Sequence, residues 1–165
     1  MSIRTILLVC IVSAVAASSN CCADTLEDIV RRQVVRVAVP DDTPPFGVSV
    51  GERLVGYDVS IARMIAIELG VRAQLVPVKS NERLPALLDR RVDLIVSSLG
   101  KNPERERQIS FTQTYAPFFL AVFGTLRTEV RKAADLSGKA IAVTKGSIED
   151  IELSKIAPPL GHRRF

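Results

Sequence analysis

The feature that most constrains the fold is an alternation of short apolar runs with helix-forming segments. Residues 34–39, 73–78 and 94–96 have the length and composition of strands, whereas residues 58–69 and 82–88 have the apolar spacing of helices. Strands that alternate with helices favour a parallel sheet covered by helices on both faces, so an α/β fold is predicted. Ligands of such sheets bind beyond the carboxyl ends of the strands.

The junction at residues 92–107, VDLIVSSLGKNPERER, is the main candidate for a binding site at that edge. Its short apolar run indicates a strand buried on both faces. Asn102 is a favoured N-cap residue and Pro103 suits the first helical position, so the helix is expected to begin at Pro103. A helix N-terminus offers free amides, and the guanidinium of Arg105 can bind a carboxylate through two parallel hydrogen bonds. The junction therefore predicts a site for a small anion, although the spacing alone also fits a solvated ERER face.

Two other loops are expected at the same edge of the sheet. Asp41 and Asp42 follow the first strand, and their carboxylates either attract the ammonium group of a ligand or serve only as turn residues. Ser80 follows the second strand, and Asn81 is expected to cap the helix after it. Because the strands are parallel, all three loops are expected to converge on one place.

Residues 111–123, FTQTYAPFFLAVF, are expected to leave one lobe and enter another, with Phe118, Phe119 and Phe123 in a core. Residues 139–143 are predicted to form a strand of that second lobe.

A capping box follows that strand, with Ser147 as N-cap and Asp150 three residues later. It predicts a second helix N-terminus at a strand end.

The N-terminus has the pattern of a secretory signal peptide, with Arg4 before an apolar core at residues 6–17 and small residues after it. The core is too short for a comfortable membrane span. Cys21 and Cys22 are adjacent and lack the spaced partners of a metal site, so no metal is expected. The scattered lysines and arginines, with six Phe, two Tyr and no Trp, argue against a nucleic-acid partner.

With these segments placed, the chain resembles the extracellular solute-binding proteins of family 3, the periplasmic amino-acid-binding components of ABC importers. The resemblance is carried by RVAVPDDTPPFG, LVGYDVSIARMIAIELG, LPALLDRRVDLIVSSLGKNPERERQISFTQTYAPF and LSGKAIAVTKGSIED, in that order. It implies a periplasmic binding protein-like fold of type II, with the first lobe largely present and the second incomplete. The implied divisions are a signal peptide at 1–23, the first lobe at 24–117 and the start of a truncated second lobe at 118–165, with an atypical tail at 158–165.

The resemblance also implies roles for individual residues. Arg105 corresponds to the arginine that binds the ligand α-carboxylate, and Ser98 to the residue whose backbone binds the ammonium group. Gly100 stands where a serine or threonine usually adds a contact, so only its backbone can act. Ser147 and Ile148 match contacts from the second lobe.

Two departures from the family pattern imply a more polar ligand. Thr43 stands where an aromatic ring is common, and Ser80 occupies a position that is often apolar. With Asp41 and Asn102, these residues complete the expected ligand-binding set.

The expected function is therefore non-enzymatic binding of a polar amino acid or similar small carboxylate in the periplasm, for an ABC permease of the inner membrane. No cofactor is expected. One alternative is an enzyme similar to cyclohexadienyl dehydratases, for which Glu149 is the candidate general acid. Another is the sensor module of a receptor or of a lytic transglycosylase.

Overall fold

The computed structural model describes residues 25–117 and 119–156. The predicted signal peptide, Phe118 and the tail at 158–165 lie outside the described residues. We call residues 25–117 the sheet unit and residues 119–156 the second segment. The elements are, in chain order, α2 (Thr25–Arg32), β1 (Val34–Val39), β2 (Asp42–Thr43), β3 (Gly47–Val50), β4 (Arg53–Val55), α3 (Tyr57–Glu68), β5 (Arg72–Pro77), α4 (Arg83–Leu88), β6 (Leu94–Ile95), α5 (Pro103–Glu106), the 3-10 helix η1 (Ala133–Leu136) and α6 (Ile148–Ile156).

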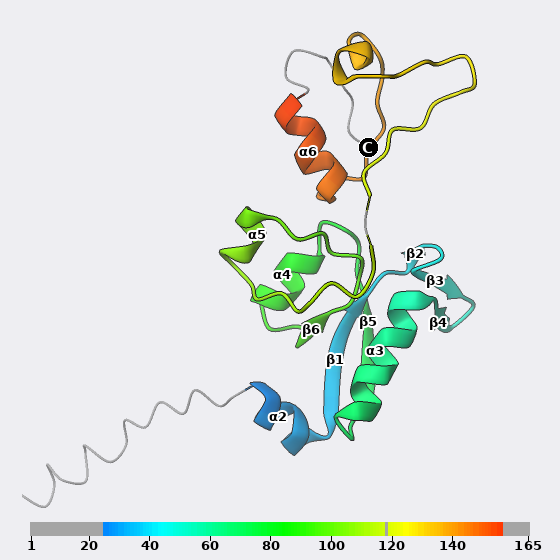
Figure 1. Cartoon of the computed structure of the whole chain (residues 1–165). Coiled ribbons are helices and arrows are strands. Elements are labelled where there is room, and N and C mark those ends of the chain that lie inside the picture. The colour runs from blue at the N-terminus through cyan, green and yellow to red at the C-terminus, as the bar shows by residue number, and fades with distance from the viewer. Residues whose placement is uncertain (1–24, 118, 157–165) are drawn as a thin grey trace, which may run out of the picture.

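A parallel three-stranded sheet in the order β5-β1-β6 forms the centre of the sheet unit (Figure 1). The register pairs Val34 with Arg72 at one end of β1 and Val39 with Pro77 at the other. On its other side β1 pairs with β6, Val37 opposite Leu94. The β-branched residues of β1 suit this position because they pack well on a pleated surface with neighbours on both sides.

Helices cover the two faces of this sheet, as the alternation in the sequence predicted (Figure 1). Val35, Val37 and Val39 of β1 are buried in one cluster with α3. Ala38 points to the other face, where it is buried in a second cluster with Ala86 of α4. Successive residues of a strand point to opposite faces, so one strand supplies both cores. The predicted α/β class is confirmed.

The prediction that residues 94–96 form a strand buried on both faces is met only in part, since Val96 is buried and Leu94 and Ile95 pack against opposite cores. β6 contains only Leu94 and Ile95, both of which are half-buried. Within the described residues β6 is an edge strand, paired with β1 alone. A strand with one neighbour leaves part of its surface uncovered, which explains the partial exposure.

The excursion after β1 is a small antiparallel sheet in the order β2-β3-β4. Its strands β3 and β4 form a hairpin, and the two-residue strand β2 pairs with β3 on the other side. Gly47 lets the returning strand approach the end of β1, since a Cβ there would lie 2.1 Å from the Pro40 carbonyl oxygen. The hairpin therefore stays beside the carboxyl end of β1.

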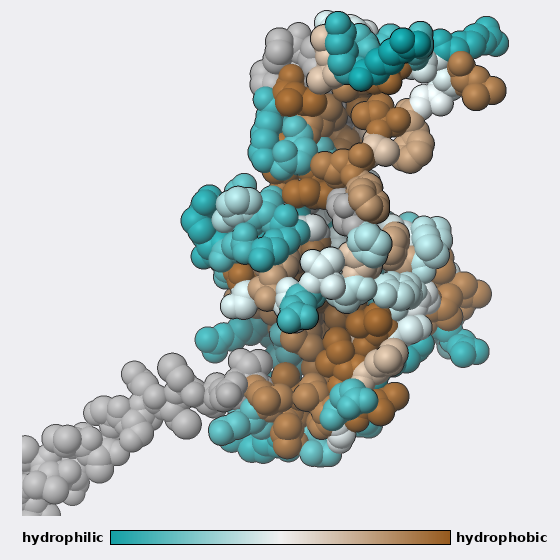
Figure 2. All heavy atoms as spheres, in the orientation of Figure 1, coloured by the Kyte–Doolittle hydropathy of each residue, from teal (hydrophilic) through white to brown (hydrophobic). Residues whose placement is uncertain are grey.

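The second segment lacks the strand predicted at residues 139–143. Phe119 and Phe123 are 85% and 91% exposed, so the prediction that they lie in a core is wrong as well. Apolar side chains are visible on the surface of this segment (Figure 2). A strand needs a hydrogen-bonded neighbour, and the described residues supply none here. Within the described ranges, no helix has the length and apolar character to cross a membrane.

Candidate functional site

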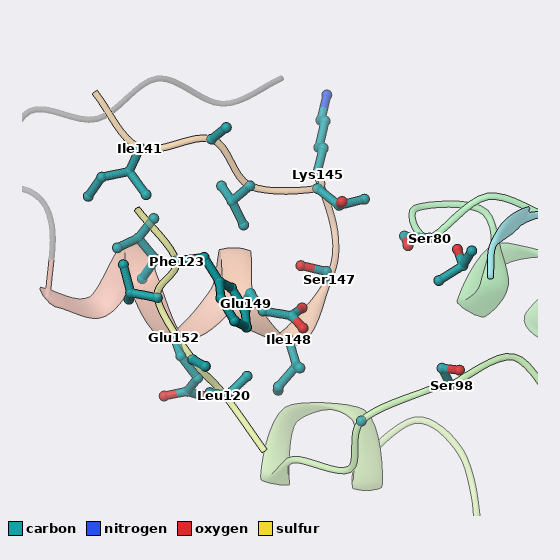
Figure 3. Close-up of a pocket in the computed structure, with 18 of the residues that line it drawn as sticks. Ser80, Ser98, Leu120, Phe123, Ile141, Lys145, Ser147, Ile148, Glu149 and Glu152 are labelled. Carbon is teal, nitrogen blue, oxygen red and sulfur yellow. The ribbon is translucent and has the colours of Figure 1, made fainter. Parts of the chain in front are cut away.

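A cavity of about 1540 Å³ opens at the carboxyl ends of the strands, between the sheet unit and the second segment. Figure 3 shows Ser80 and Ser98 on one side of the gap and the loop of Ser147 with the N-terminus of α6 on the other. The cavity is lined by seven of the nine residues predicted to bind ligand, namely Thr43, Ser80, Ser98, Gly100, Arg105, Ser147 and Ile148.

The other two predicted residues, Asp41 and Asn102, do not line this cavity. The Asn102 side chain is used locally, because its Oδ1 accepts a hydrogen bond from the Arg105 amide at 2.8 Å. This is the N-cap predicted from the sequence, and α5 begins at Pro103 as expected. Asn102 thus fixes the backbone of Arg105 and makes no contact with the cavity itself. In the loop after β1, the acidic residue that lines the cavity is Asp42 and not Asp41.

The Arg105 guanidinium lies in the cavity wall and is 7% exposed. Its Nη1 donates to the Gly100 carbonyl at 2.6 Å, and its Nη2 donates to the Gly146 carbonyl at 3.0 Å. Gly146 belongs to the second segment, so this arginine joins the two parts of the molecule. Burial lowers the pKa of Arg105, and the charges of Glu104 and Glu149 partly oppose that effect.

Arg83 is a second buried cation of the cavity, and the sequence analysis missed it. It is 6% exposed, its Nη1 donates to the Ser98 carbonyl at 3.5 Å, and its Nε has no hydrogen-bond partner among the described residues. Burial lowers the pKa of Arg83 and the nearby charge of Arg105 lowers it further, whereas the charges of Asp58, Asp42 and Glu149 partly oppose this shift. None of the ion pairs within residues 25–117 and 119–156 involves either arginine.

A signal for Arg83 was present in the sequence. It is the first residue of α4, which follows β5, just as Arg105 lies in the first turn of α5, which follows β6. Both arginines therefore stand at a helix N-terminus beyond the carboxyl end of a strand. The prediction that Asn81 caps α4 is wrong. The N-cap residue of this helix is Glu82, and its side chain makes no capping hydrogen bond.

The contacts from the second segment arise at the start of α6. Ser147 caps this helix, since its Oγ accepts a hydrogen bond from the Asp150 amide at 3.2 Å, as predicted. Ile148 packs against Gly100, where an added Cβ would lie 3.1 Å from the Ile148 Cβ. Figure 3 shows Ile148 pointing toward the sheet unit. Glu149 also lines the cavity.

The lining contains more basic than acidic side chains. Five are basic (Lys79, Arg83, Arg105, Lys139 and Lys145) and three are acidic (Asp42, Glu149 and Glu152). The described residues contain no group of three or more histidine, cysteine, aspartate or glutamate side chains placed to hold a metal ion. The arrangement suits a small organic anion with polar groups.

Comparison with known proteins identifies the family. Residues 35–156 match the model of the bacterial extracellular solute-binding proteins, family 3. The chain belongs to this family. The resemblance noted from the sequence segments is therefore confirmed. The proteins of this family are extracellular, which agrees with the secreted location that the resemblance implies.

Individual relatives support the same assignment. The arginine-binding extracellular protein ArtP of Bacillus subtilis is 28% identical over 122 residues, which are 74% of this chain and 48% of that protein. The glutamate/aspartate import solute-binding protein of Salmonella typhimurium is 28% identical over 140 residues, which are 80% of this chain and 46% of that protein. The chain thus spans about half the length of these curated relatives.

A solved structure shows the same fold. It is the ancestral amino acid-binding protein AncCDT-1, a precursor of cyclohexadienyl dehydratase, with a TM-score of 0.75 at 25% identity. The match covers 86% of this chain and 65% of the solved one. The type II binding protein fold, with one part incomplete, is confirmed.

Proposed function

We propose that this family 3 solute-binding protein binds an amino acid or related small carboxylate that carries a second anionic group. In this proposal the protein acts in the periplasm and delivers its ligand to an ABC permease of the inner membrane. The observation that carries the proposal is a pair of buried arginines, Arg83 and Arg105, in one cavity, neither of which forms an ion pair with an acidic residue of the described part of the chain.

Arg105 supplies the site for the first carboxylate. Its two terminal nitrogens are only 2.6 and 3.0 Å from the carbonyl oxygens of Gly100 and Gly146, so they are already directed at acceptors. A carboxylate that replaces the Gly146 carbonyl gains a charge-assisted hydrogen bond, which is about twice as strong as a neutral one. Arg105 is held for this contact by its Asn102 cap.

Arg83 supplies the site for the second anionic group. A buried guanidinium with an unpartnered Nε is costly unless an acceptor reaches it, and two buried like charges repel each other. An anionic side chain in the cavity would relieve both costs. A neutral side chain with an acceptor oxygen would relieve the first cost alone, and a cationic one would add to the repulsion.

The ammonium group of an amino acid has acidic partners available in the same cavity. Asp42 lies on the loop after β1, and Glu149 lies in the first turn of α6. The ligands named for the two relatives, arginine and glutamate/aspartate, differ in charge. The buried positive charge of Arg83 favours the anionic ligand over arginine.

Titration calorimetry tests the proposal with glutamate, glutamine and arginine as probes. We expect wild-type protein to bind glutamate at least about tenfold more tightly than glutamine, because a hydrogen bond to a charged group contributes about 1.5–3 kcal/mol. Arg83→Met should remove this preference, whereas Arg105→Ala should weaken binding of all three probes.

The matched control is Arg107→Ala, which removes an exposed arginine from the same ERER stretch. It should bind every probe as wild type does. Circular dichroism melts verify that each variant is folded before its affinity is compared. A wild-type protein that prefers arginine, or an Arg83→Met variant that keeps the preference for glutamate, would contradict the proposed ligand class.

A further inference from the structure

Asp58 is a buried carboxylate outside the cavity lining, in the first turn of α3, and it is 0% exposed. Its Oδ2 accepts a hydrogen bond from the Ser98 hydroxyl at 2.7 Å, and its Oδ1 accepts one from the Tyr115 hydroxyl at 3.1 Å. No ion pair of the described chain includes Asp58. Two hydroxyl donors, the N-terminus of α3 and the nearby positive charge of Arg83 therefore stabilise a charge whose burial is costly.

One of these donors, Ser98, has a strained backbone in the cavity wall. Its φ of 47° lies in the left-handed region, which non-glycine residues adopt rarely and only when their surroundings impose it. Two contacts impose it here, the hydroxyl bond to Asp58 and the bond from Arg83 Nη1 to the Ser98 carbonyl at 3.5 Å. Asp58 thereby fixes the carbonyl that receives the Arg83 guanidinium.

The other donor, Tyr115, lies in the segment that leads from the sheet unit to the second segment. Its ring stacks on Tyr57, with centroids 6.2 Å apart and 28° between the planes. The Tyr57 hydroxyl donates back to the Tyr115 carbonyl at 3.3 Å. The connecting segment is therefore attached to α3 by a ring pair and by two hydroxyl groups.

We propose that Asp58 is a positioning residue that couples the ligand cavity to the connecting segment. It holds Ser98, and through Ser98 the Arg83 guanidinium, in the arrangement that receives the ligand. It also accepts a hydrogen bond from Tyr115, so a displacement of the connecting segment would shift Asp58 and, through it, Ser98. The inference rests on the proposed function insofar as it assigns ligand binding to this cavity.

The first test needs no ligand, because the chain contains two tyrosines and no tryptophan. In Tyr57→Phe protein, Tyr115 is the single tyrosine, and its ionisation can be followed by tyrosinate absorbance. Burial and the charge of Asp58 raise the pKa of Tyr115 well above its usual range. Adding Asp58→Asn should move this ionisation toward the ordinary tyrosine value of about 10. An unchanged titration would overturn the proposal.

The second test measures affinity for glutamate in two variants that each lose one tyrosine hydroxyl. Tyr115→Phe removes a donor to the Asp58 carboxylate and should weaken binding by roughly three- to tenfold, because a hydrogen bond to a charged group contributes about 1.5–3 kcal/mol and only part of this is transmitted to the ligand. Tyr57→Phe, the matched control, keeps the ring pair and both bonds to Asp58, so it should weaken binding less than Tyr115→Phe does. Equal affinities of the two variants would overturn the coupling.

The two tests separate this inference from the proposed function. If the wild-type protein binds none of the probes, the proposed function fails. The Tyr115 titration then still decides the role of Asp58: a lowered ionisation supports the positioning contact, and an unchanged one overturns it.

Discussion

Two stretches of similar sequence have different structures in this protein. Residues 34–39, VVRVAV, form β1, whereas residues 139–143, KAIAV, form no strand. Both contain β-branched residues and one basic residue, and both precede a loop that lines the cavity. Four valines favour an extended backbone in the first stretch, and Ile141 and Val143 favour it less strongly in the second, where Lys139 and two alanines are weaker strand formers.

The difference lies in their neighbours. β1 has β5 on one side and β6 on the other, with α3 and α4 over its faces. In the described residues, the stretch at 139–143 has no hydrogen-bonded neighbour. Strand formation is thus decided by non-local partners, and the sheet unit has them. We expect the sheet unit to carry most of the stability of the described chain.

The largest difference in stability is expected when an aspartate is placed in one stretch or in the other. Val37 is 0% exposed and lies between two strands, so Val37→Asp should lower the free energy of unfolding by about 3–5 kcal/mol, enough to unfold a marginal domain. The matched variant, Ile141→Asp, should leave the melting temperature nearly unchanged. Thermal melts followed by circular dichroism give both values. Equal losses would show that the second segment contributes as much as the sheet unit.

Limited proteolysis compares the same two regions by their rates of cleavage. Phe119, Phe123 and Leu126 are exposed, so chymotrypsin should cut there on the order of a hundredfold faster than within residues 34–96. Mass spectrometry should find a resistant fragment that contains the sheet unit. As a control, Phe123→Ala should remove one early cut and leave the others. Cuts of equal rate in both regions would contradict the comparison.

The next contrast concerns ion pairs. The sheet unit has an ion pair with a buried carboxylate, whereas the described residues of the second segment have only exposed ion pairs. The Asp93 side chain is 2% exposed and pairs with Arg36 at 2.8 Å and with Arg32. Burial alone would raise the pKa of Asp93, but hydrogen bonds from Arg36 and Arg32 outweigh it and hold this pKa below its usual range. The Asp93 carboxylate therefore stabilises the folded protein when it is ionised.

We expect Asp93→Asn to lower the free energy of unfolding by about 1–3 kcal/mol at neutral pH, because it leaves the Arg36 amide and two partly exposed guanidinium groups without a charged acceptor. The difference from wild type should be constant above the unfolded pKa of about 3.9 and should shrink as the pH falls through the lower folded pKa. Urea unfolding at several pH values measures it. Glu152→Gln breaks an exposed pair with Lys155 and should cost less than about 0.5 kcal/mol. A difference that widened on acidification would refute the assigned role of Asp93.

Much of the sheet unit could be predicted because its signals are local. The run at 34–39 matches β1, and the helix predicted at 58–69 matches α3, which ends shortly before Gly70, whose φ is +65°. Asn102 and Pro103 marked the start of α5 because a cap and a proline act within one turn. The local signals thus also placed Arg105 at the cavity.

The rest depends on long-range packing. Arg83 and Asp58 are ordinary charged residues of a first helical turn until the sheet brings Ser98 beside them, from 15 and 40 positions away in the chain. The strand predicted at 139–143 failed for the same reason, since its neighbours determine whether it forms. The sequence therefore predicted the loops that line the cavity but not the buried charges of Arg83 and Asp58.

The smallest expected effect separates the two regions most sharply, because it removes the same kind of helix cap from each. Asn102→Ala deletes the cap of α5, and Ser147→Ala deletes the cap of α6. A lost cap costs about 1 kcal/mol. If the sheet unit dominates stability, Asn102→Ala should lower the main melting transition by a few degrees, roughly 4–8 °C for a domain of this size, and weaken glutamate binding by loosening Arg105.

Ser147→Ala should instead raise hydrogen exchange within α6 and leave the main transition in place. Asn102→Asp, which keeps an acceptor at the cap, should restore both properties. Equal shifts of the melting temperature in the two alanine variants would mean that α6 folds cooperatively with the sheet unit, through the contacts of Gly146 with Arg105 and of Ile148 with Gly100.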